Sequence, residues 1–373
     1  MLVAVLSGLG ACNPETQEAE RAERRPTWNR KFHGEMLALG ADAQTALMVV
    51  GTAPDVKERG EDHIYALDGE GTVLWEEPLD RRLLRIAVAG DGSRIVATLV
   101  DGTLLAWNAH GERQWDGTCA GLPEISRSGD RIVCWNSGEE SVGGIAIEAL
   151  DGRGRRLWSF DDPGGIWDMA IAEDAGTVAA LTSAGNVIVL DGRGRLLWRK
   201  EIGVLVGTVA LAPGEDPTIA VGTGIEGESV AVYDRAGKEI WAAGVPGGTD
   251  TIALSENGAI AAMGNNTVLG QRVYVYDGEG TLSWKFQLDR PAREPVRVRI
   301  SRSGDRVFAT LQDEGQPTML GWDSHGGVIA RVRFGADVVE YALSDKGDRL
   351  AVITAGGKLL YYDLHADREE ALR

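Results

Sequence analysis

The side chains that most often carry chemistry are few and widely spaced in this chain of 373 residues. Of the five histidines, His110, His325 and His365 each stand two residues after an Asp or Asn that begins a turn. Turns so far apart in the chain belong to separate hairpins, so we expect exposed turn residues rather than a three-histidine metal site. The chain contains no CxxC, HExxH or GxSxG motif. The sequence therefore predicts no enzyme, no bound metal and no cofactor.

A glycine-rich segment matches a second chemical motif. Gly222, Gly224 and Gly227 fit the GxGxxG pattern of dinucleotide-binding loops. That pattern works only where it follows a strand and opens a helix whose N-terminus holds the pyrophosphate. Here the next residues, 229–234 (SVAVYD), indicate another strand that ends in a turn. A dinucleotide site is therefore not predicted.

Two cysteines, Cys119 and Cys134, flank a predicted hairpin whose turn lies near Ser128. Antiparallel pairing around that turn places Cys134 opposite residue 122, with Cys119 three positions further along. That offset is about 10 Å at the rise of a strand, which exceeds the reach of about 7 Å for a disulfide. We expect two unpaired thiols unless the backbone bends.

The charge balance excludes one class of partner. Asp and Glu outnumber Lys and Arg by 56 to 38, which gives a formal net charge of −18. Such a charge repels nucleic-acid backbones and anionic lipid headgroups at long range. Hydrophobic residues make up 43% of the chain and Gly contributes 50 residues, a composition typical of a turn-rich globular protein rather than a disordered one. We expect no nucleic-acid partner.

These residues are set into a repeat. An apolar strand ending in Asp, a Gly-containing turn and a strand carrying Trp recur at 64–75, 146–158, 187–198, 230–241 and 273–284, with weaker copies at 104–115, 319–330 and 359–367. The residues that end the apolar strands, here called anchors, are spaced 40 to 46 residues apart and are Asp68, Asn108, Asp151, Asp191, Asp234, Asp277, Asp323 and Asp363. A second hairpin with a Gly turn precedes most anchors, as at 125–135 and 300–311. This period is typical of propeller blades of four strands, named A to D from the axis outward.

The strand count indicates how the ring closes. Eight A/B hairpins and eight C strands are present, but only seven D strands follow them. Residues 27–32 (TWNRKF) resemble the missing D strand, and pairing them with 358–363 hides both sheet edges. We predict an all-β, eight-bladed propeller over residues 27–373, built from four-stranded antiparallel blades, closed by the N-terminal strand and monomeric.

The tryptophans fall into two groups. Seven share one repeat position and are predicted to be wedges between neighbouring blades: Trp28, Trp75, Trp115, Trp158, Trp198, Trp241 and Trp284. Trp167 lies elsewhere, in GGIWDMAI, where the chain passes from an outer strand to an inner one. Trp167 is therefore a candidate for exposure on a binding face, with burial as the alternative.

The N-terminus resembles that of bacterial lipoproteins. Residues 1–11 (MLVAVLSGLGA) are apolar and run into Cys12, so residues 9–12 (LGAC) are similar to a lipobox. The apolar run is too short to span a bilayer. The resemblance implies a signal segment at 1–12, a lipidated Cys12 and a location in the cell envelope, on the membrane by lipid anchor only. Residues 13–26 are charged and predict a solvated tether. A cytosolic protein with an apolar tail is the alternative.

The repeat itself resembles a known family. Tyr65, Asp68, Gly71 and Trp75 form a YxxDxxGxxxW pattern that is similar to the repeat of PQQ-like propellers, which include quinoproteins and the BamB-type lipoproteins of outer-membrane assembly. The A/B hairpins resemble WD-type repeats, and the likeness covers residues 27–367. The resemblance implies a non-catalytic envelope scaffold that binds a protein partner. A small quinoprotein dehydrogenase and a ligand-sensing propeller are the alternatives.

The partner is expected on one face of the ring. The D-to-A links and B-to-C loops vary in sequence, whereas the A-to-B and C-to-D turns are nearly uniform, and variable loops on a rigid scaffold carry function. Aligning the A strands on their turns places eight residues near the channel mouth: Met36, Arg85, Leu122, Asp168, Thr208, Thr251, Arg297 and Glu340. Arg85, Asp168, Arg297 and Glu340, with Trp167, could bind a polar partner segment. The alternative is that these charges pair with each other across the axis.

Overall fold

The repeated anchors each organise a tight turn between two strands. The Asp68 Oδ1 atom accepts hydrogen bonds from the Glu70 and Thr72 N–H groups at 3.0 and 2.8 Å. The same pair of bonds forms at Asn108, Asp151, Asp191, Asp277 and Asp323. A short carboxylate or amide side chain thus caps its own turn, which explains why the repeat requires Asp or Asn there.

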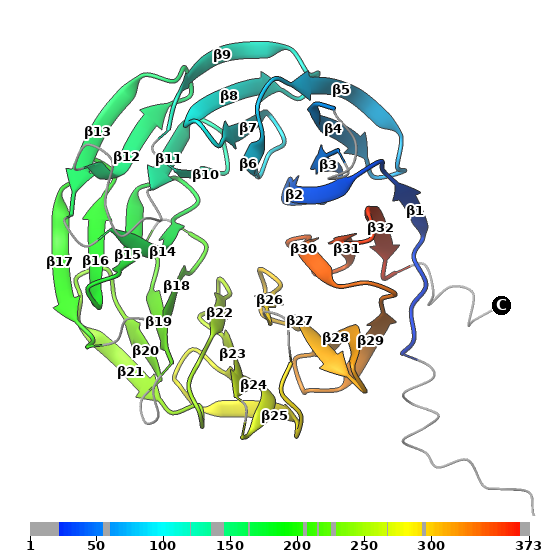
Figure 1. Cartoon of the computed structure of the whole chain (residues 1–373). Helices are drawn as coiled ribbons and strands as arrows, with labels where there is room; N and C mark the ends of the chain where they lie inside the picture. The colour runs from blue at the N-terminus through cyan, green and yellow to red at the C-terminus, as the bar shows by residue number, and fades with distance from the viewer. Residues whose placement is uncertain are drawn as a thin grey trace, which may run out of the picture.

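A computed structural model describes residues 22–54, 60–119, 121–135, 145–162, 165–203, 207–214, 216–224, 229–266, 268–292 and 296–365. These residues form strands but no helix, and therefore no helix long and apolar enough to cross a membrane. The strands form eight four-stranded antiparallel sheets arranged around a central axis (Figure 1). The predicted eight-bladed propeller is confirmed.

The first four blades follow one another along the chain. Blade 1 contains β2(Glu35–Ala41), β3(Leu47–Ala53), β4(Asp62–Asp68) and β5(Val73–Leu79); blade 2 contains β6(Leu83–Val88), β7(Arg94–Leu99), β8(Thr103–Asn108) and β9(Arg113–Thr118). Blade 3 contains β10(Leu122–Ile125), β11(Arg131–Trp135), β12(Ile145–Asp151) and β13(Arg156–Asp161); blade 4 contains β14(Ile166–Ile171), β15(Thr177–Thr182), β16(Asn186–Asp191) and β17(Leu196–Glu201).

The other four blades complete the ring. Blade 5 contains β18(Gly207–Leu211), β19(Ile219–Thr223), β20(Val230–Tyr233) and β21(Glu239–Ala243); blade 6 contains β22(Thr251–Leu254), β23(Ile260–Asn266), β24(Gly270–Tyr276) and β25(Leu282–Leu288). Blade 7 contains β26(Val298–Ile300), β27(Arg306–Asp313), β28(Gln316–Asp323) and β29(Val328–Arg333); blade 8 contains β30(Val338–Leu343), β31(Arg349–Thr354), β32(Lys358–Asp363) and β1(Trp28–Lys31).

The ring closes as predicted, because β1 supplies the outer strand of the last blade. Trp28 lies opposite Tyr361, and Lys31 lies opposite Lys358. The Trp28 and Tyr361 rings stack with centroids 5.2 Å apart. Figure 1 shows β1 (blue) beside β32 (red), so the two ends of the repeat share one sheet.

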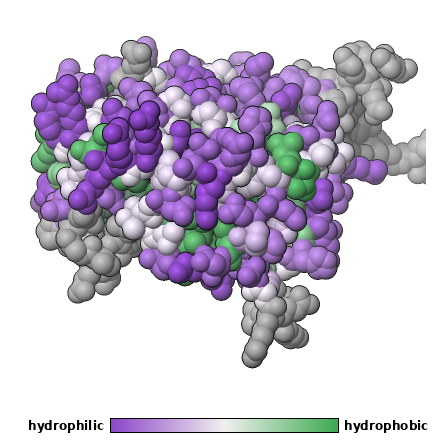
Figure 2. Space-filling model, turned by 90° about the horizontal axis from the view of Figure 1, so that it is seen from above, coloured by the Kyte–Doolittle hydropathy of each residue, from purple (hydrophilic) through white to green (hydrophobic). Residues whose placement is uncertain are grey.

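Each junction between neighbouring blades buries an apolar cluster, and eight such clusters surround the axis. Strands B and C are buried on both faces; every residue of β3 and of β15, for example, is buried. The outer D strands alternate between more and less exposed residues instead. Figure 2 shows one flank of the ring as mainly hydrophilic, with small separate hydrophobic areas.

The seven repeat tryptophans are wedges between blades, as predicted. The Trp158 Nε1–H group donates to the Gly192 carbonyl of the next blade at 3.1 Å, and a Cβ atom at Gly194 would lie 2.6 Å from the Trp158 ring. Gly194 also has a φ of 76°, which favours glycine. Equivalent ring-to-glycine contacts occur at Trp28, Trp75, Trp115, Trp198, Trp241 and Trp284. Tryptophan and glycine therefore form matched pairs at seven of the eight junctions.

The junction between blades 7 and 8 differs. Ala330 occupies the tryptophan position of β29, and the sequence has Ala366 where the other blades have the turn glycine. Residues 22–24 lie along β29 instead: the Arg24 N–H donates to the Arg331 carbonyl at 2.8 Å, and the Arg331 N–H donates to the Ala22 carbonyl at 2.7 Å. Ala22 is buried. The described end of the charged N-terminal segment is therefore attached to the ring.

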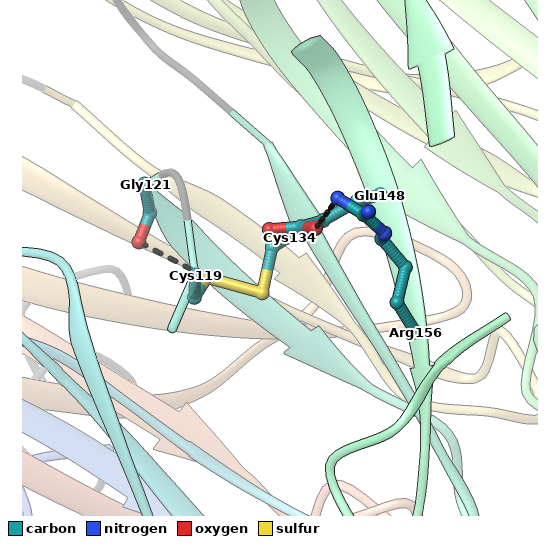
Figure 3. Close-up of a disulfide and its surroundings, with 5 residues drawn as sticks. All are labelled: Cys119, Gly121, Cys134, Glu148 and Arg156. Carbon is teal, nitrogen blue, oxygen red and sulfur yellow. Dashed lines mark hydrogen bonds and ion pairs between the residues drawn. A yellow bond between two sulfur atoms is a disulfide. The ribbon is translucent and has the colours of Figure 1, made fainter. Parts of the chain in front are cut away.

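The expectation of two unpaired thiols is wrong, because Cys119 and Cys134 form a disulfide with Cα atoms 5.6 Å apart (Figure 3). The register is close to the prediction, with Cys134 opposite Pro123. The error lies in treating residues 119–121 as a straight extension of β10. Cys119 and Gly121 belong to the link from β9 to β10, and the Cys119 Sγ atom lies 3.4 Å from the Gly121 carbonyl oxygen. This bend brings Cys119 beside β11.

Candidate functional site

The A strands carry side chains to the mouth of a central cavity of about 900 Å³. Arg85 lies on β6, Asp168 on β14 and Glu340 on β30, and Arg297 directly precedes β26. In each of these blades the turn after the A strand contains one residue with positive φ. All four side chains stand seven residues before that turn residue, so they lie at one level of the channel. All four line the cavity, together with Trp167, Thr208 and Thr251.

Met36 was expected at this level and is not part of it. Met36 is buried, 4% exposed, in the cluster between blades 8 and 1. The register of β2 with β3 shifts between Met36 and Ala38, just as that of β6 with β7 shifts between Leu83 and Arg85. Both strands carry this irregularity, so Met36 corresponds to Leu83. The turn of blade 1 has Thr45 at the position of positive φ where blade 2 has Gly92, and Ala38 stands seven residues before it. Ala38 is therefore the blade 1 equivalent of Arg85.

The charged residues of the mouth pair between neighbouring blades. The Arg297 Nη1 atom lies 2.5 Å from Glu340 Oε1, and the Arg299 Nη2 atom lies 3.6 Å from the same oxygen. Arg85 Nη2 lies 3.7 Å from Glu124 Oε1. We call Arg85, Glu124, Asp168, Arg297, Arg299 and Glu340 the mouth cluster. Of the two sequence alternatives, mutual pairing is present, but between adjacent blades rather than across the axis.

Burial and charge act against each other at the carboxyl groups. Burial alone would raise the pKa of Glu340, but the charges of Arg297 and Arg299 outweigh it and hold that pKa below its ordinary value. At Glu124 burial dominates, and the pKa is raised despite Arg85 and Arg299. Solvent still reaches the cluster, because the Arg85, Arg297 and Arg299 side chains are 40 to 51% exposed.

Asp168 has a positioning role within the wall. Its Oδ2 atom accepts a hydrogen bond from the Val209 N–H group of blade 5 at 2.9 Å, and its Oδ1 atom accepts one from the Met169 N–H at 3.0 Å. Burial raises the pKa of Asp168, and these hydrogen bonds only partly offset that effect. Asp168 therefore joins blades 4 and 5.

Trp167 is exposed at the rim of the same cavity. Trp167 is the second residue of β14 and is 49% exposed, far more than the large aromatic residues of the core. Leu84, which directly precedes Arg85, is 44% exposed. A half-exposed tryptophan beside a hollow offers a partner both apolar area and an N–H donor.

The next level of the channel wall is lined mostly by small side chains. The residues two positions further along the A strands are Gly40, Ala87, Glu124, Ala170, Ala210, Ala253, Arg299 and Ala342. Six of these eight carry at most a methyl group. The small residues leave room at the axis, and the two charged ones project into that room from blades 3 and 7.

At the other end of the channel, charged residues of the A-to-B turns cross the axis. Arg127 of blade 3 contacts Glu173 of blade 4 at 3.0 Å and Asp345 of blade 8 at 2.8 Å. Arg302 of blade 7 contacts Glu173 through Nη2 at 3.0 Å and Glu256 through Nε at 2.9 Å. We call these five residues the axial charge cluster. Arg127 and Glu173 line both the 900 Å³ cavity and a second hollow of about 530 Å³, so the cluster separates the two.

Main-chain hydrogen bonds between neighbouring A-to-B turns support this cluster, and among the described residues they join six of the eight pairs of adjacent blades. The A-to-B turns of successive blades are joined from Asp345 N to Ala43 O, Ala43 N to Gly90 O, Asp91 N to Arg127 O, Arg127 N to Glu173 O, Glu256 N to Arg302 O, and Arg302 N to Asp345 O, at 2.7 to 3.0 Å. Blade 5 has Pro213 in its turn, and proline has no N–H to donate.

Sequence reasoning missed the axial charge cluster. The A-to-B turns looked uniform, and their charged residues looked like solvated turn residues. One signal was present: the second residue after the A strand is Arg in blades 3 and 7 and acidic in blades 4, 6 and 8. Opposite charges at one repeat position are expected where turns converge on an axis.

The remaining chemical candidates lie apart. The backbone N–H groups of His110, His325 and His365 donate to their own anchors at 2.9 to 3.0 Å, on separate blades. Over the described part of the chain, no group of three or more His, Cys, Asp or Glu residues is placed to hold a metal. The GxGxxG segment lies between β19 and β20, and its last three residues fall outside the described ranges.

The fold and the channel define an eight-bladed propeller, and comparisons with known proteins agree. A family model described as "Outer membrane protein assembly factor BamB" matches residues 60–218, a little less than half of the chain. No curated protein matches. BamB from Moraxella catarrhalis is 16% identical with a TM-score of 0.65, over 91% of this chain and 99% of that one. The resemblance to PQQ-like propellers is thus confirmed.

A second solved protein is also similar in structure. Sqt1 from Chaetomium thermophilum, in a structure bound to the N-terminus of the ribosomal protein L10, has a TM-score of 0.71 at 13% identity. The match covers 91% of this chain and 99% of that chain. At such identities the likeness concerns the fold.

Proposed function

We propose that this protein is a non-catalytic scaffold that binds a protein partner at the mouth of its channel. The observation that carries the proposal is Trp167, which is 49% exposed at the rim of a 900 Å³ cavity whose inner end is occupied by the axial charge cluster. Aromatic side chains beside a hollow are typical anchors of interfaces. A partner segment would enter from the mouth and stop at the axial charge cluster.

Two propellers of similar fold support this reading. Sqt1 is described in complex with the N-terminus of a ribosomal protein, and BamB is described as an assembly factor. By analogy, an end or loop of a partner chain fits the mouth, where Arg85, Arg297 and Glu340 would meet its polar groups. Arg297 already pairs with Glu340, and Arg85 with Glu124. A partner that binds there would exchange these ion pairs for its own, so they would contribute more to selectivity than to affinity.

The test compares variants in a pull-down from membranes of the native host, with the captured partner quantified by mass spectrometry. Trp167→Ala and Arg85→Ala should each reduce capture at least tenfold while leaving the unfolding midpoint within a few degrees. The matched controls are Leu157→Ala, 46% exposed on the outer strand β13, and Arg153→Ala in an exposed C-to-D turn. Equal losses in the controls would show that the mouth is not the interface.

We also propose that the scaffold is held in the cell envelope through Cys12, which lies outside the described residues. The Cys119–Cys134 disulfide supports an oxidising compartment, because disulfides persist there and are rare in the cytosol. The described residues 22–24 lie along blade 7, so a lipid on Cys12 would tether the ring by its rim. The Cys12→Ser variant should lose the acyl mass and leave the membrane fraction; an unmodified wild-type Cys12 would contradict the anchor.

A further inference from the structure

The outside of blades 3, 4 and 5 concentrates positive charge. The outer strands β13, β17 and β21 follow one another around the ring (Figure 1). In these blades the second to sixth residues after the anchor include one acidic residue, Glu239, and six Arg or Lys residues: Arg153, Arg155, Arg156, Arg193, Arg195 and Lys238. The same positions in blades 1, 2, 6 and 7 include three acidic residues and one Arg. In a chain of net charge −18, this segregation sets one sector of the ring apart.

Most of this positive charge is accessible. Arg153, Arg193 and Lys238 are exposed, and their side chains have no ion-pair partner among the described residues. Arg155 and Arg195 contact their own anchors through Nη2 at 2.7 and 2.6 Å, but their side chains remain 73 and 71% exposed. We call the exposed surface of β13, β17 and β21, with the turn before each strand, the basic rim.

Aliphatic side chains lie within the basic rim. The residue directly before the wedge tryptophan is 42 to 48% exposed in all three blades: Leu157, Leu197 and Ile240. The Trp158 Nε1–H group of β13 donates at 3.1 Å to the Gly192 carbonyl, in the turn that carries Arg193. Trp198 of β17 makes the same contact with the turn of blade 5. Each outer strand therefore touches the basic turn of the next blade, and the basic rim is continuous.

The outer edge of these strands is open. Among the described strands, β17 pairs only with β16, and β13 and β21 likewise have one neighbour each. The equivalent edge of β29 is occupied, because residues 22–24 exchange main-chain hydrogen bonds with Arg331. The acidic side chain of that segment, Glu23, lies 3.8 Å from the Arg333 Nη1 atom of β29 through Oε1. An extended segment with an acidic residue therefore fits beside an outer strand of this ring.

We propose that the basic rim binds an extended, acidic segment of a partner protein, added as a fifth strand at the edge of β17. Arg199 follows Trp198 just as Arg331 follows the tryptophan position of β29, so its main chain is the equivalent attachment point. Acidic side chains of the segment meet the arginines of the turns, and aliphatic ones cover Leu197. In this mode main-chain hydrogen bonds give affinity and side chains give specificity.

Charge alone would also suit an anionic lipid surface. The open edge favours a polypeptide, because an extended chain offers N–H and C=O groups in the order that a strand requires. Lipid headgroups offer no such row of donors and acceptors. The two partners therefore differ in their dependence on main-chain hydrogen bonds.

Fluorescence anisotropy with the purified full chain tests the proposal. The probe is a labelled peptide that alternates Glu and Val and is longer than the six residues of β17. A second peptide has the same side chains but methylated main-chain N–H groups. Wild type should bind the first peptide saturably at low ionic strength and the second about tenfold more weakly. Vesicles of equal parts phosphatidylcholine and phosphatidylglycerol should not displace the first peptide.

Two variants with matched controls locate the binding. Arg193→Glu should weaken peptide binding about fivefold, and Leu197→Ala about threefold. Arg82→Glu makes the same charge change at an exposed residue between β5 and β6. Leu74→Ala removes a leucine that is 51% exposed at the same repeat position of blade 1, where the turn carries Glu rather than Arg. Both controls should bind like wild type.

The basic rim is tested independently of the mouth. Arg85→Ala, which removes a residue of the mouth cluster, should bind the peptide like wild type. In the pull-down, a partner held by the basic rim would be lost with Leu157→Ala and Arg153→Ala and kept with Trp167→Ala. The failure of one proposal is therefore distinguishable from the failure of the other.

Three results would overturn the proposal. The first is no saturable peptide binding to wild type, and the second is equal binding of the methylated peptide, which would leave charge alone as the cause. The third is an equal loss in Arg193→Glu and Arg82→Glu. Displacement of the peptide by the vesicles would also contradict the proposal and assign the basic rim to a lipid surface.

Discussion

Arg302 of blade 7 and Glu173 of blade 4 contact each other across the channel axis, although three blade junctions separate them around the ring. Arg127 and Asp345 make a second connection of this kind, between blades 3 and 8. Most stabilising contacts of a propeller join neighbouring blades. These ion pairs also join non-adjacent blades and so fix the diameter of the inner ring.

Acid should weaken this connection first. Burial acts to raise the pKa of Glu173, but the hydrogen bonds and charges of Arg302 and Arg127 lower it below its ordinary value of 4.5. A carboxyl group with a lowered pKa stabilises the fold fully above that ordinary value, and the stabilisation is lost as the pH falls through the lower folded pKa. The difference in unfolding free energy between wild type and Glu173→Gln should therefore be largest near pH 7 and shrink below about pH 4.

Urea unfolding at pH 7, 5, 4 and 3 provides the measurement. Glu279→Gln is the control, because Glu279 is an exposed residue of a C-to-D turn and its removal should change little at any pH. If the difference in unfolding free energy between wild type and Glu173→Gln stays constant from pH 7 to pH 3, the charged form of Glu173 has no stabilising role.

The repeat allowed the fold to be predicted because its determinants are local. Asp or Asn anchors cap their own turns, and each Trp meets a glycine one repeat later, so the spacing alone defines the blades. Three features were not predictable in this way. Cys119 pairs with Cys134 through a bend in a link, Ala38 rather than Met36 matches Arg85 because Thr45 takes the place of glycine in the turn of blade 1, and residues 173 and 302 meet only because the ring closes. The first and the last depend on long-range geometry, and the second on a turn residue other than glycine, so a strand-by-strand alignment contains none of them.

Ring closure predicts a graded response to N-terminal truncation. Deleting residues 1–33 removes β1 and exposes the edge of β32, and loss of Trp28 alone should cost about 3–5 kcal/mol. Deleting residues 1–20 should leave the unfolding midpoint unchanged. Deleting residues 1–25 should fall between the two, because it removes the bonds of Ala22 and Arg24 to β29. Calorimetry on the three truncations checks the order, and equal midpoints would disprove closure by β1.

The disulfide should contribute measurably to stability. It closes a loop of 15 residues between Cys119 and Cys134, for which the chain-entropy relation gives about 3 kcal/mol. The Cys119→Ser/Cys134→Ser variant should unfold at lower urea concentration than wild type. Reductant should lower the wild-type midpoint and leave the variant unaffected. A reductant effect of equal size on both proteins would point to another cause.

Two glycine variants separate the effect of the tryptophan contact from the effect of backbone strain. Gly194→Ala introduces a methyl group 2.6 Å from the Trp158 ring at a φ of 76°. Gly315→Ala is the matched control, because Gly315 has a φ of 80° but nothing within 4 Å of an added Cβ atom. The control should cost about 1–2 kcal/mol for conformation only, and Gly194→Ala clearly more. Equal losses of unfolding free energy would mean that the ring contact is unimportant.

The pairing of β1 with β32 also sets the order of events during synthesis. The Thr27 hydroxyl and the Asp363 N–H, which bond at 2.8 Å, are 336 residues apart in the chain. At about 5–20 residues per second, the first strand leaves the ribosome roughly 20 to 70 s before its partner exists. Throughout that interval β1 is a free strand that can pair with the wrong sheet edge. The nascent N-terminal strand therefore has no native partner until the last blade has been made.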